Sequence, residues 1–126
     1  MIEITSRAPD CKIRAYDTGE IVLSAPLTSR MRLKDCDHVQ IFMCRSNGFD
    51  EMFISKCDES SGLEARRRTK KGRSLRIFSK RAASIMLNDK SKGIFKMGET
   101  VKKGDKELHT ILYFKNYAER KEVHTV

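Results

Sequence analysis

The fold of this chain is decided by two short stretches, Ile21-Val22-Leu23-Ser24 and Leu75-Arg76-Ile77-Phe78-Ser79. Each begins with residues that favour strands and ends in a serine whose hydroxyl can cap a helix. Pro26 suits the first turn of a short helix after Ser24, and the apolar residues from Ala82 to Leu87 recur with helical spacing after Ser79. We therefore predict a strand–helix–strand unit in each half of the chain.

Further strands are predicted from alternating apolar residues and turn signals. A hairpin is expected around Asp17-Thr18-Gly19, and a second hairpin around Ser46-Asn47-Gly48. The run 108–114 is apolar on both sides, which predicts a central, buried strand. The remaining strands are expected over 2–5, 11–16, 39–43, 52–54 and 93–96.

The predicted fold class is α+β: a small, strand-rich domain with hairpins and two short helices. The two halves share a plan, which indicates either two pseudo-repeated halves or a chance likeness between similar units. With 126 residues, the chain is expected to form a single domain over 1–126. Its parts would be a hairpin-rich N-terminal half (1–57), a basic mobile loop (58–73) and a strand–helix–strand C-terminal half (74–117).

The net charge of +9 is concentrated in one segment. Between Glu64 and Arg81, nine basic residues accompany one acidic residue, so eighteen positions carry +8 and the remainder is nearly neutral. Such a block repels itself unless an anion approaches, and arginine can bind phosphate bidentately. We therefore predict phosphate contacts at Arg66, Arg67, Arg68, Lys70, Lys71, Arg73, Arg76, Lys80 and Arg81.

A resemblance extends over residues 12–57. The segment has Gly19-Glu20-Ile21-Val22-Leu23-Ser24-Ala25-Pro26, then Arg30, then Leu33-Lys34-Asp35-Cys36-Asp37-His38-Val39, and the strand Met52-Phe53-Ile54-Ser55. It resembles the swapped-hairpin domain of AbrB-type transition-state regulators, with Cys36 at the place of that pattern's glycine.

The resemblance implies a bacterial-type regulator of transcription that binds DNA as an intertwined homodimer. It adds Lys12, Arg14, Arg30 and Arg32 as candidate DNA contacts. If the internal repeat is real, one chain would form by itself what those proteins form by dimerising.

Other chemistry has weaker support in the sequence. Zinc could be bound by the side chains of Cys36, His38, Cys44 and Cys57, but their spacing in the sequence lacks the close ligand pairs typical of zinc sites. The cysteines are therefore expected to be reduced thiols. No nucleophile, phosphate-loop or metalloprotease motif is present, so we predict neither catalysis nor a cofactor. A metal-dependent nuclease using Asp35, Asp37, Asp50 and Glu51 is the less favoured enzymatic alternative.

The predicted function is therefore non-catalytic binding of nucleic acid, with DNA favoured over RNA. The main alternative is a protein–protein adaptor whose basic loop binds an acidic partner. No membrane association is expected, because no run approaches the roughly 18 apolar residues that a spanning helix needs. The start of the sequence lacks a signal-peptide pattern, which predicts a cytoplasmic location.

Overall fold

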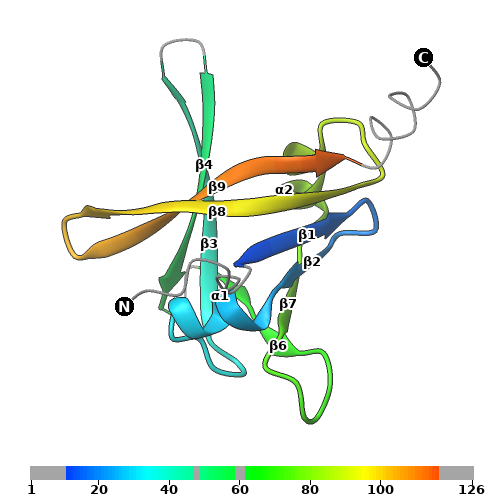
Figure 1. Cartoon of the computed structure of the whole chain (residues 1–126), viewed down its shortest axis with the longest axis vertical. Coiled ribbons are helices and arrows are strands. Elements are labelled where there is room, and N and C mark those ends of the chain that lie inside the picture. Colours follow the sequence, from blue (N-terminus) through cyan, green and yellow to red (C-terminus); the bar gives the residue numbers. More distant parts are fainter. Residues whose placement is uncertain (1–10, 47–48, 59–61, 117–126) are drawn as a thin grey trace, which may run out of the picture.

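The computed structural model describes residues 11–46, 49–58 and 62–116, so the strand expected over 2–5 lies outside the described residues. Two helices and nine strands occur within the described part of the chain (Figure 1). In chain order they are β1 (Lys12–Tyr16), β2 (Glu20–Leu23), α1 (Ala25–Arg30), β3 (His38–Ser46), β4 (Phe49–Cys57), β5 (Leu63–Glu64), β6 (Arg66–Arg67), β7 (Leu75–Phe78), α2 (Lys80–Leu87), β8 (Lys92–Lys103) and β9 (Lys106–Asn116).

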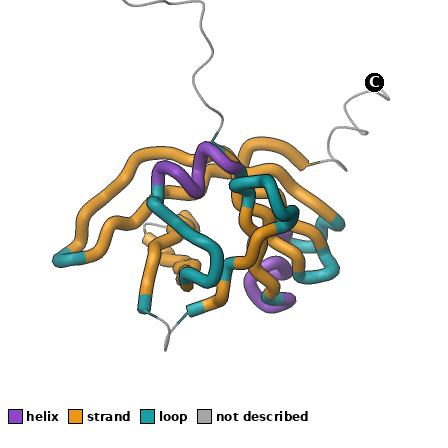
Figure 2. The backbone as a smooth tube through the Cα atoms, turned by 90° about the horizontal axis from the view of Figure 1, so that it is seen from below, coloured by secondary structure: helices purple, strands orange, loops and turns teal. Residues whose placement is uncertain are grey.

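All nine strands form one antiparallel sheet in the order β5-β3-β4-β9-β8-β1-β2-β7-β6. The two strands at the ends of this order are neighbours in the sequence, with Ala65 alone between them. Ala65 is fully buried, accepts a hydrogen bond from the Cys36 amide (2.8 Å) and donates one to the Asp37 carbonyl (2.7 Å). The sheet therefore curls until it nearly closes on itself, as Figure 2 shows.

The interior of this curled sheet is apolar. Alternate residues of the strands point inward, and Phe95, Ile13, Ile54 and Ile77 are among the largest fully buried side chains. The helices add Leu27 from α1 and Ala83, Met86 and Leu87 from α2 to the same core. Burial of these apolar surfaces is the main force that holds the short strands together.

Both helices begin at the predicted serines. The Ser24 hydroxyl accepts a hydrogen bond from the Leu27 amide at 3.4 Å, and the Ser79 hydroxyl accepts one from the Ala82 amide at 3.0 Å. Each serine has an extended backbone and satisfies an amide that has no partner within its helix. The predicted strand–helix–strand unit is thus present in both halves of the chain.

The structure differs from the sequence-based expectation in three places. We predicted a loop without strands over 58–73. This is wrong for residues 63–64 and 66–67, which form the short strands β5 and β6. The strand expected over 93–96 extends through Lys103 and pairs with β9 in a long hairpin. β9 lies centrally between β4 and β8, but Leu112 is 48% exposed, so this strand is not buried on both sides.

Neither helix in the described part of the chain is long and apolar enough to cross a membrane.

Candidate nucleic-acid interface

The strand pairing divides the arginine run between two surfaces. Arg66 pairs with Arg76, whereas Arg67 pairs with Leu75, whose side chain is buried. The Arg68 amide donates a hydrogen bond to the Ser74 carbonyl at 3.4 Å and continues the pairing. Because successive side chains of a strand point to opposite faces, Arg66 and Arg68 share the outer face of the sheet and Arg67 points the other way.

Arg67 faces a hollow that we call the basic groove. It has a volume of about 630 Å³ and lies between the segment 28–35, at the end of α1, and the loop after β6. Thr28, Leu33 and Leu75 contribute to its lining. Six cationic side chains and one carboxylate, Asp35, complete the charged part of the lining: Arg32, Lys34, Arg67, Lys70, Lys71 and Arg73.

Hydrogen bonds to the backbone give the loop side of the groove its shape. The Asp35 carboxylate accepts a hydrogen bond from the Arg67 amide at 2.9 Å, and the Thr28 hydroxyl donates one to the Arg73 carbonyl at 2.9 Å. The Arg67 guanidinium donates to the Lys70 carbonyl at 3.2 Å. These contacts fix the loop backbone while Lys70 and Lys71 remain exposed, so the groove presents cations that can meet an anion.

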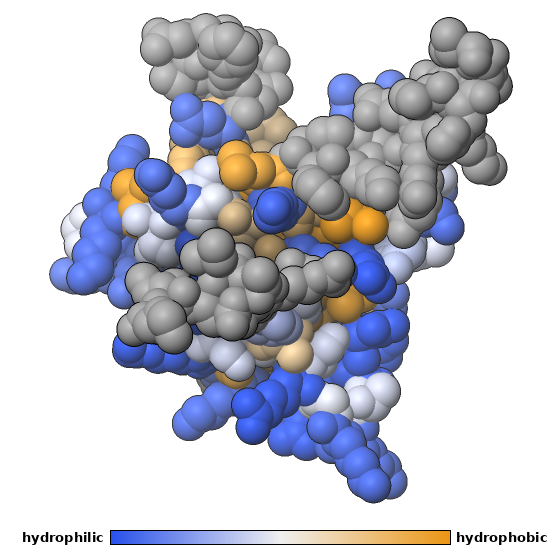
Figure 3. Space-filling view, in the orientation of Figure 1, coloured by the Kyte–Doolittle hydropathy of each residue, from blue (hydrophilic) through white to orange (hydrophobic). Residues whose placement is uncertain are grey.

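Figure 3 shows strongly hydrophilic side chains gathered at the lower end of the molecule, where Figure 1 places the loop after β6. This end contains the cations of the segment 66–73. The basic residues that are close together in the sequence are therefore also close together in the folded chain. Arg32 and Lys34, from the turn after α1, add two more cations to them.

The second surface, which we call the cationic sheet face, is the outer face of β8, β1, β2, β7 and β6. One row across it pairs Arg14 with Val22, Val22 with Arg76, and Arg76 with Arg66. The adjacent row has Lys12 paired with Lys96. A hollow of about 190 Å³ on this face is lined by Lys12, Arg14, Val22, Ser24, Ala25, Arg68 and Ser74.

Some cations of the sheet face have acidic neighbours. Arg76 lies 3.3 Å from the Glu20 carboxylate, and Arg66 lies 3.2 Å from Glu64. Arg66 also donates a hydrogen bond to the Cys36 sulfur at 2.9 Å. This hydrogen bond, followed by the charge of Glu64, raises the pKa of Arg66.

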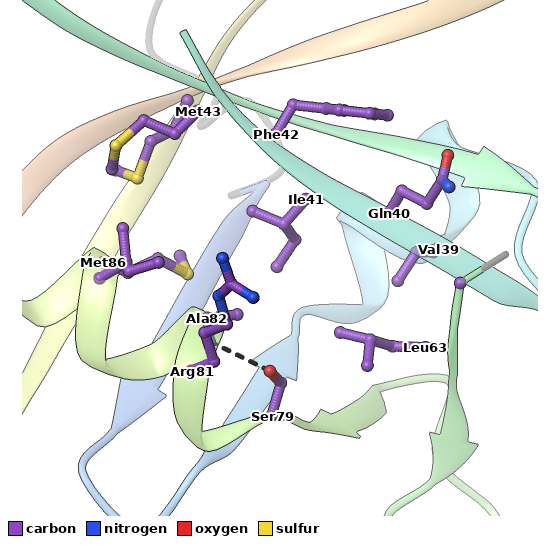
Figure 4. A pocket seen from close by; sticks show the side chains of 13 residues that line it. Val39, Gln40, Ile41, Phe42, Met43, Leu63, Ser79, Arg81, Ala82 and Met86 are labelled. Carbon is purple, nitrogen blue, oxygen red and sulfur yellow. Dashed lines mark hydrogen bonds between the residues drawn. The ribbon is translucent and has the colours of Figure 1, made fainter. Parts of the chain in front are cut away.

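Three of the thirteen predicted contacts lie away from both surfaces. Arg30 donates hydrogen bonds to the Gly98 carbonyl (2.7 Å) and the Thr100 hydroxyl (2.8 Å), so it supports the middle of β8. Lys80 packs against the turn at Gly19. Arg81 lines a largely apolar hollow of about 580 Å³ between α2 and β3, shown in Figure 4.

Of the other ten, Arg32, Arg67, Lys70, Lys71 and Arg73 line the basic groove, and Lys12, Arg14, Arg66, Arg68 and Arg76 lie on the cationic sheet face. Sequence reasoning missed Lys34 and Lys96. Lys34 could have been found from its position beside Arg32, whereas Lys96 depends on the pairing of β8 with β1.

The candidate metal ligands are not grouped in the structure. Among the described residues, no three histidine, cysteine, aspartate or glutamate side chains lie close enough to hold a metal ion. Asp35 and Asp37 instead accept hydrogen bonds from the backbone amides of Arg67 and Lys34. The side chain of Asp50 lies outside the described part of the structure.

Comparison of the chain with protein families, with curated proteins and with solved structures finds no match. These comparisons therefore supply nothing that indicates catalysis, and the resemblance to AbrB-type regulators stays a prediction from the sequence.

Proposed function

We propose that the protein binds nucleic acid without catalysing a reaction on it and that the basic groove holds the phosphates. The observation that carries the proposal is the gathering of six cationic side chains around one groove, with Asp35 as the single carboxylate in its lining. Phosphate contacts of this kind release condensed counterions and give binding with little sequence preference. DNA is favoured over RNA because of the resemblance to DNA-binding regulators.

A chain of phosphates fits the groove better than a single small anion does. The cations come from two segments that are separate in the sequence, 32–34 and 67–73. A single phosphate would occupy few of these donors and leave the others mutually repelling, whereas a polyanion neutralises them together. Arginines can add bidentate contacts, and lysines add compact charges.

The strand pairing supports two pseudo-repeated halves. The order β1-β2-α1-β3-β4 corresponds to β5/β6-β7-α2-β8-β9, if β5 and β6 count as one bent strand. When each strand is replaced by its counterpart in the other half, every strand pair becomes another observed pair. The pair β1–β2 becomes β6–β7, the pair β3–β4 becomes β8–β9, and the pair β1–β8 becomes β5–β3. The pairs β2·β7 and β4·β9 join equivalent strands. The halves are thus interleaved, as two chains would be in a swapped-hairpin homodimer.

A backbone feature at Cys36 also fits the proposed kinship. Cys36 has φ +76°, in the left-handed region that favours glycine. The AbrB-type pattern has glycine at this position. On this proposal the single chain contains both halves of the DNA-binding unit, and regulation of transcription is the role that the kinship suggests.

The test is fluorescence anisotropy with labelled duplex and single-stranded DNA at several salt concentrations. Wild-type protein is expected to bind with a log–log salt slope of about −4 or steeper on duplex, equivalent to about five phosphates. The Lys70→Ala/Lys71→Ala variant should weaken binding on every sequence and reduce the slope by about 2, one for each lysine.

The matched control is Lys102→Ala/Lys103→Ala, because these exposed lysines also adjoin one another and lie at the far end of the β8–β9 hairpin (Figure 1). Both variants lower the net charge equally. If the control loses as much affinity as the groove variant, net charge rather than the groove explains binding, and the proposed site is wrong. If wild-type protein does not bind DNA or RNA even at low salt, the proposed function is wrong, and an acidic protein partner becomes the next candidate.

A further inference from the structure

We infer that the cationic sheet face selects single-stranded over double-stranded nucleic acid and that Phe78 stacks on an unpaired base. This inference rests on the proposed function and assigns a second task to residues that the basic groove does not use.

Two adjacent rows of the sheet face are cationic. The first contains Lys96 and Lys12, and Arg68 at its other end beside Ser74. The second contains Arg14 and Arg76 among its cations. Neighbouring strands lie about 4.8 Å apart, so the five strands from β8 to β6 span about 19 Å, which is enough for several consecutive phosphates.

The next row on the same face contains two aromatic side chains, Tyr16 and Phe78, together with Glu20 and Lys92. Glu20 pairs with Phe78, and Tyr16 ends β1 on the other side of Glu20, facing Lys92. Phe78 is 58% exposed, which is unusual for a phenylalanine, while Tyr16 is half-buried. The Arg76 guanidinium lies 5.5 Å from the centre of the Phe78 ring and holds it beside the cationic rows.

The charge pattern orients a bound strand. Glu20, ion-paired with Arg76, places a carboxylate between the two rings and disfavours phosphate beside Phe78, whereas Lys92 lies beyond Tyr16 at the other end of the row. Phosphates are therefore expected on the rows that contain Lys12 and Arg14, with bases directed towards Phe78. An aromatic ring on an exposed sheet can stack only on a base whose face is open, and the bases of a duplex are already stacked on one another.

The experiment compares single-stranded and duplex DNA of equal length, about 12 nucleotides, with three Phe78 variants. Phe78→Ala and Phe78→Leu should each weaken single-strand binding about 10-fold and change duplex binding less than twofold, because a duplex offers no open base on which Phe78 could stack. Phe78→Trp should retain single-strand affinity. Met43→Ala is the matched control, because Met43 is 45% exposed on β3 and its partner Met52 pairs with the buried Ile111, which places Met43 on the opposite side of the sheet from the cationic sheet face.

Phe78→Trp also reports stacking directly. The natural sequence has no tryptophan, so this variant has a single indole at the proposed contact. Its fluorescence should be quenched by single-stranded DNA and little changed by duplex. Circular dichroism of each variant would verify that the fold is retained.

The outcomes separate this inference from the proposed function. If Phe78→Ala binds single strands as wild type does and the indole is not quenched, the inference is wrong. The proposed function still stands in that case, provided that binding remains salt-dependent and sensitive to Lys70→Ala/Lys71→Ala. A wild-type preference for duplex would likewise overturn the inference alone.

Discussion

Asp35 offers a sharp test of the basic groove, because its carboxylate has two opposing effects there. It lies among six cations and would repel a bound phosphate, yet it accepts the hydrogen bond from the Arg67 amide that fixes the loop. Asp35→Asn removes the charge and keeps an acceptor oxygen. Asp35→Ala removes both, so the two variants separate charge from shape.

The expected magnitude follows from Coulomb's law. A phosphate in the groove would lie on the order of 6 Å from the Asp35 carboxylate, and two unit charges at that distance in water interact by about 0.7 kcal/mol. Asp35→Asn should therefore bind DNA about 3-fold more tightly at low salt, and the gain should shrink as salt screens the charge. Asp35→Ala should gain less, because loss of the exposed hydrogen bond to Arg67 would destabilise the loop by about 1 kcal/mol.

The assay is anisotropy with labelled DNA at low and physiological salt, with urea unfolding to measure stability. Asp105→Asn is the charge-matched control, because Asp105 is exposed in the turn between β8 and β9 and outside the groove. Equal gains in Asp105→Asn and Asp35→Asn would show that only net charge matters. Weaker binding by Asp35→Asn would refute the reasoning outright, since it would make the carboxylate part of the binding surface.

Three further predictions concern the fold. Phe95→Ala should lower the free energy of unfolding by about 3–5 kcal/mol in urea titrations, because Phe95 is the largest fully buried side chain among the described residues. Ser24→Ala and Ser79→Ala should each cost about 1 kcal/mol in the same measurement, because each removes a helix cap. Burial, followed by the charge of Arg30, lowers the pKa of His109, so the unfolded chain binds a proton more readily than the folded protein. The urea midpoint should stay constant above pH 6.5 and decrease as the pH drops below that value. His109→Gln should remove the part of this decrease that comes from protonation of His109.

Local signals in the sequence were sufficient for the helices and most strands. The two serines cap their helices as predicted, because capping depends only on residues within one turn. β5 and β6 were missed, because two-residue strands made mostly of charged residues are too short to show a period. Their signal was the apolar pair Leu63 and Ala65, of which Leu63 packs partly buried against the core and Ala65 is completely buried where the sheet closes.

The sequence located the charge but not its arrangement. Ten of the thirteen predicted cations fall on the two surfaces, since charge density in the chain is retained when consecutive residues stay near one another. Arg30 could not be placed in advance, because its partners Gly98 and Thr100 lie about seventy positions away in the sequence. The register of β6 against β7, which separates Arg67 from its neighbours, likewise depends on tertiary pairing.

That register changes what an arginine run can do. In a flexible loop, Arg66, Arg67 and Arg68 would act as one diffuse charge. Because β6 pairs with β7 beside the buried Ala65, Arg67 faces the basic groove, whereas Arg66 and Arg68 lie on the cationic sheet face. A ligand that contacts all three must therefore pass around the edge of the sheet. A flexible single strand can follow such a path, whereas a duplex, with a persistence length of about 150 base pairs, would have to bend sharply. On the proposed function, the strand pairing beside one small alanine thus places a single arginine run on two surfaces that would make different demands on a nucleic acid.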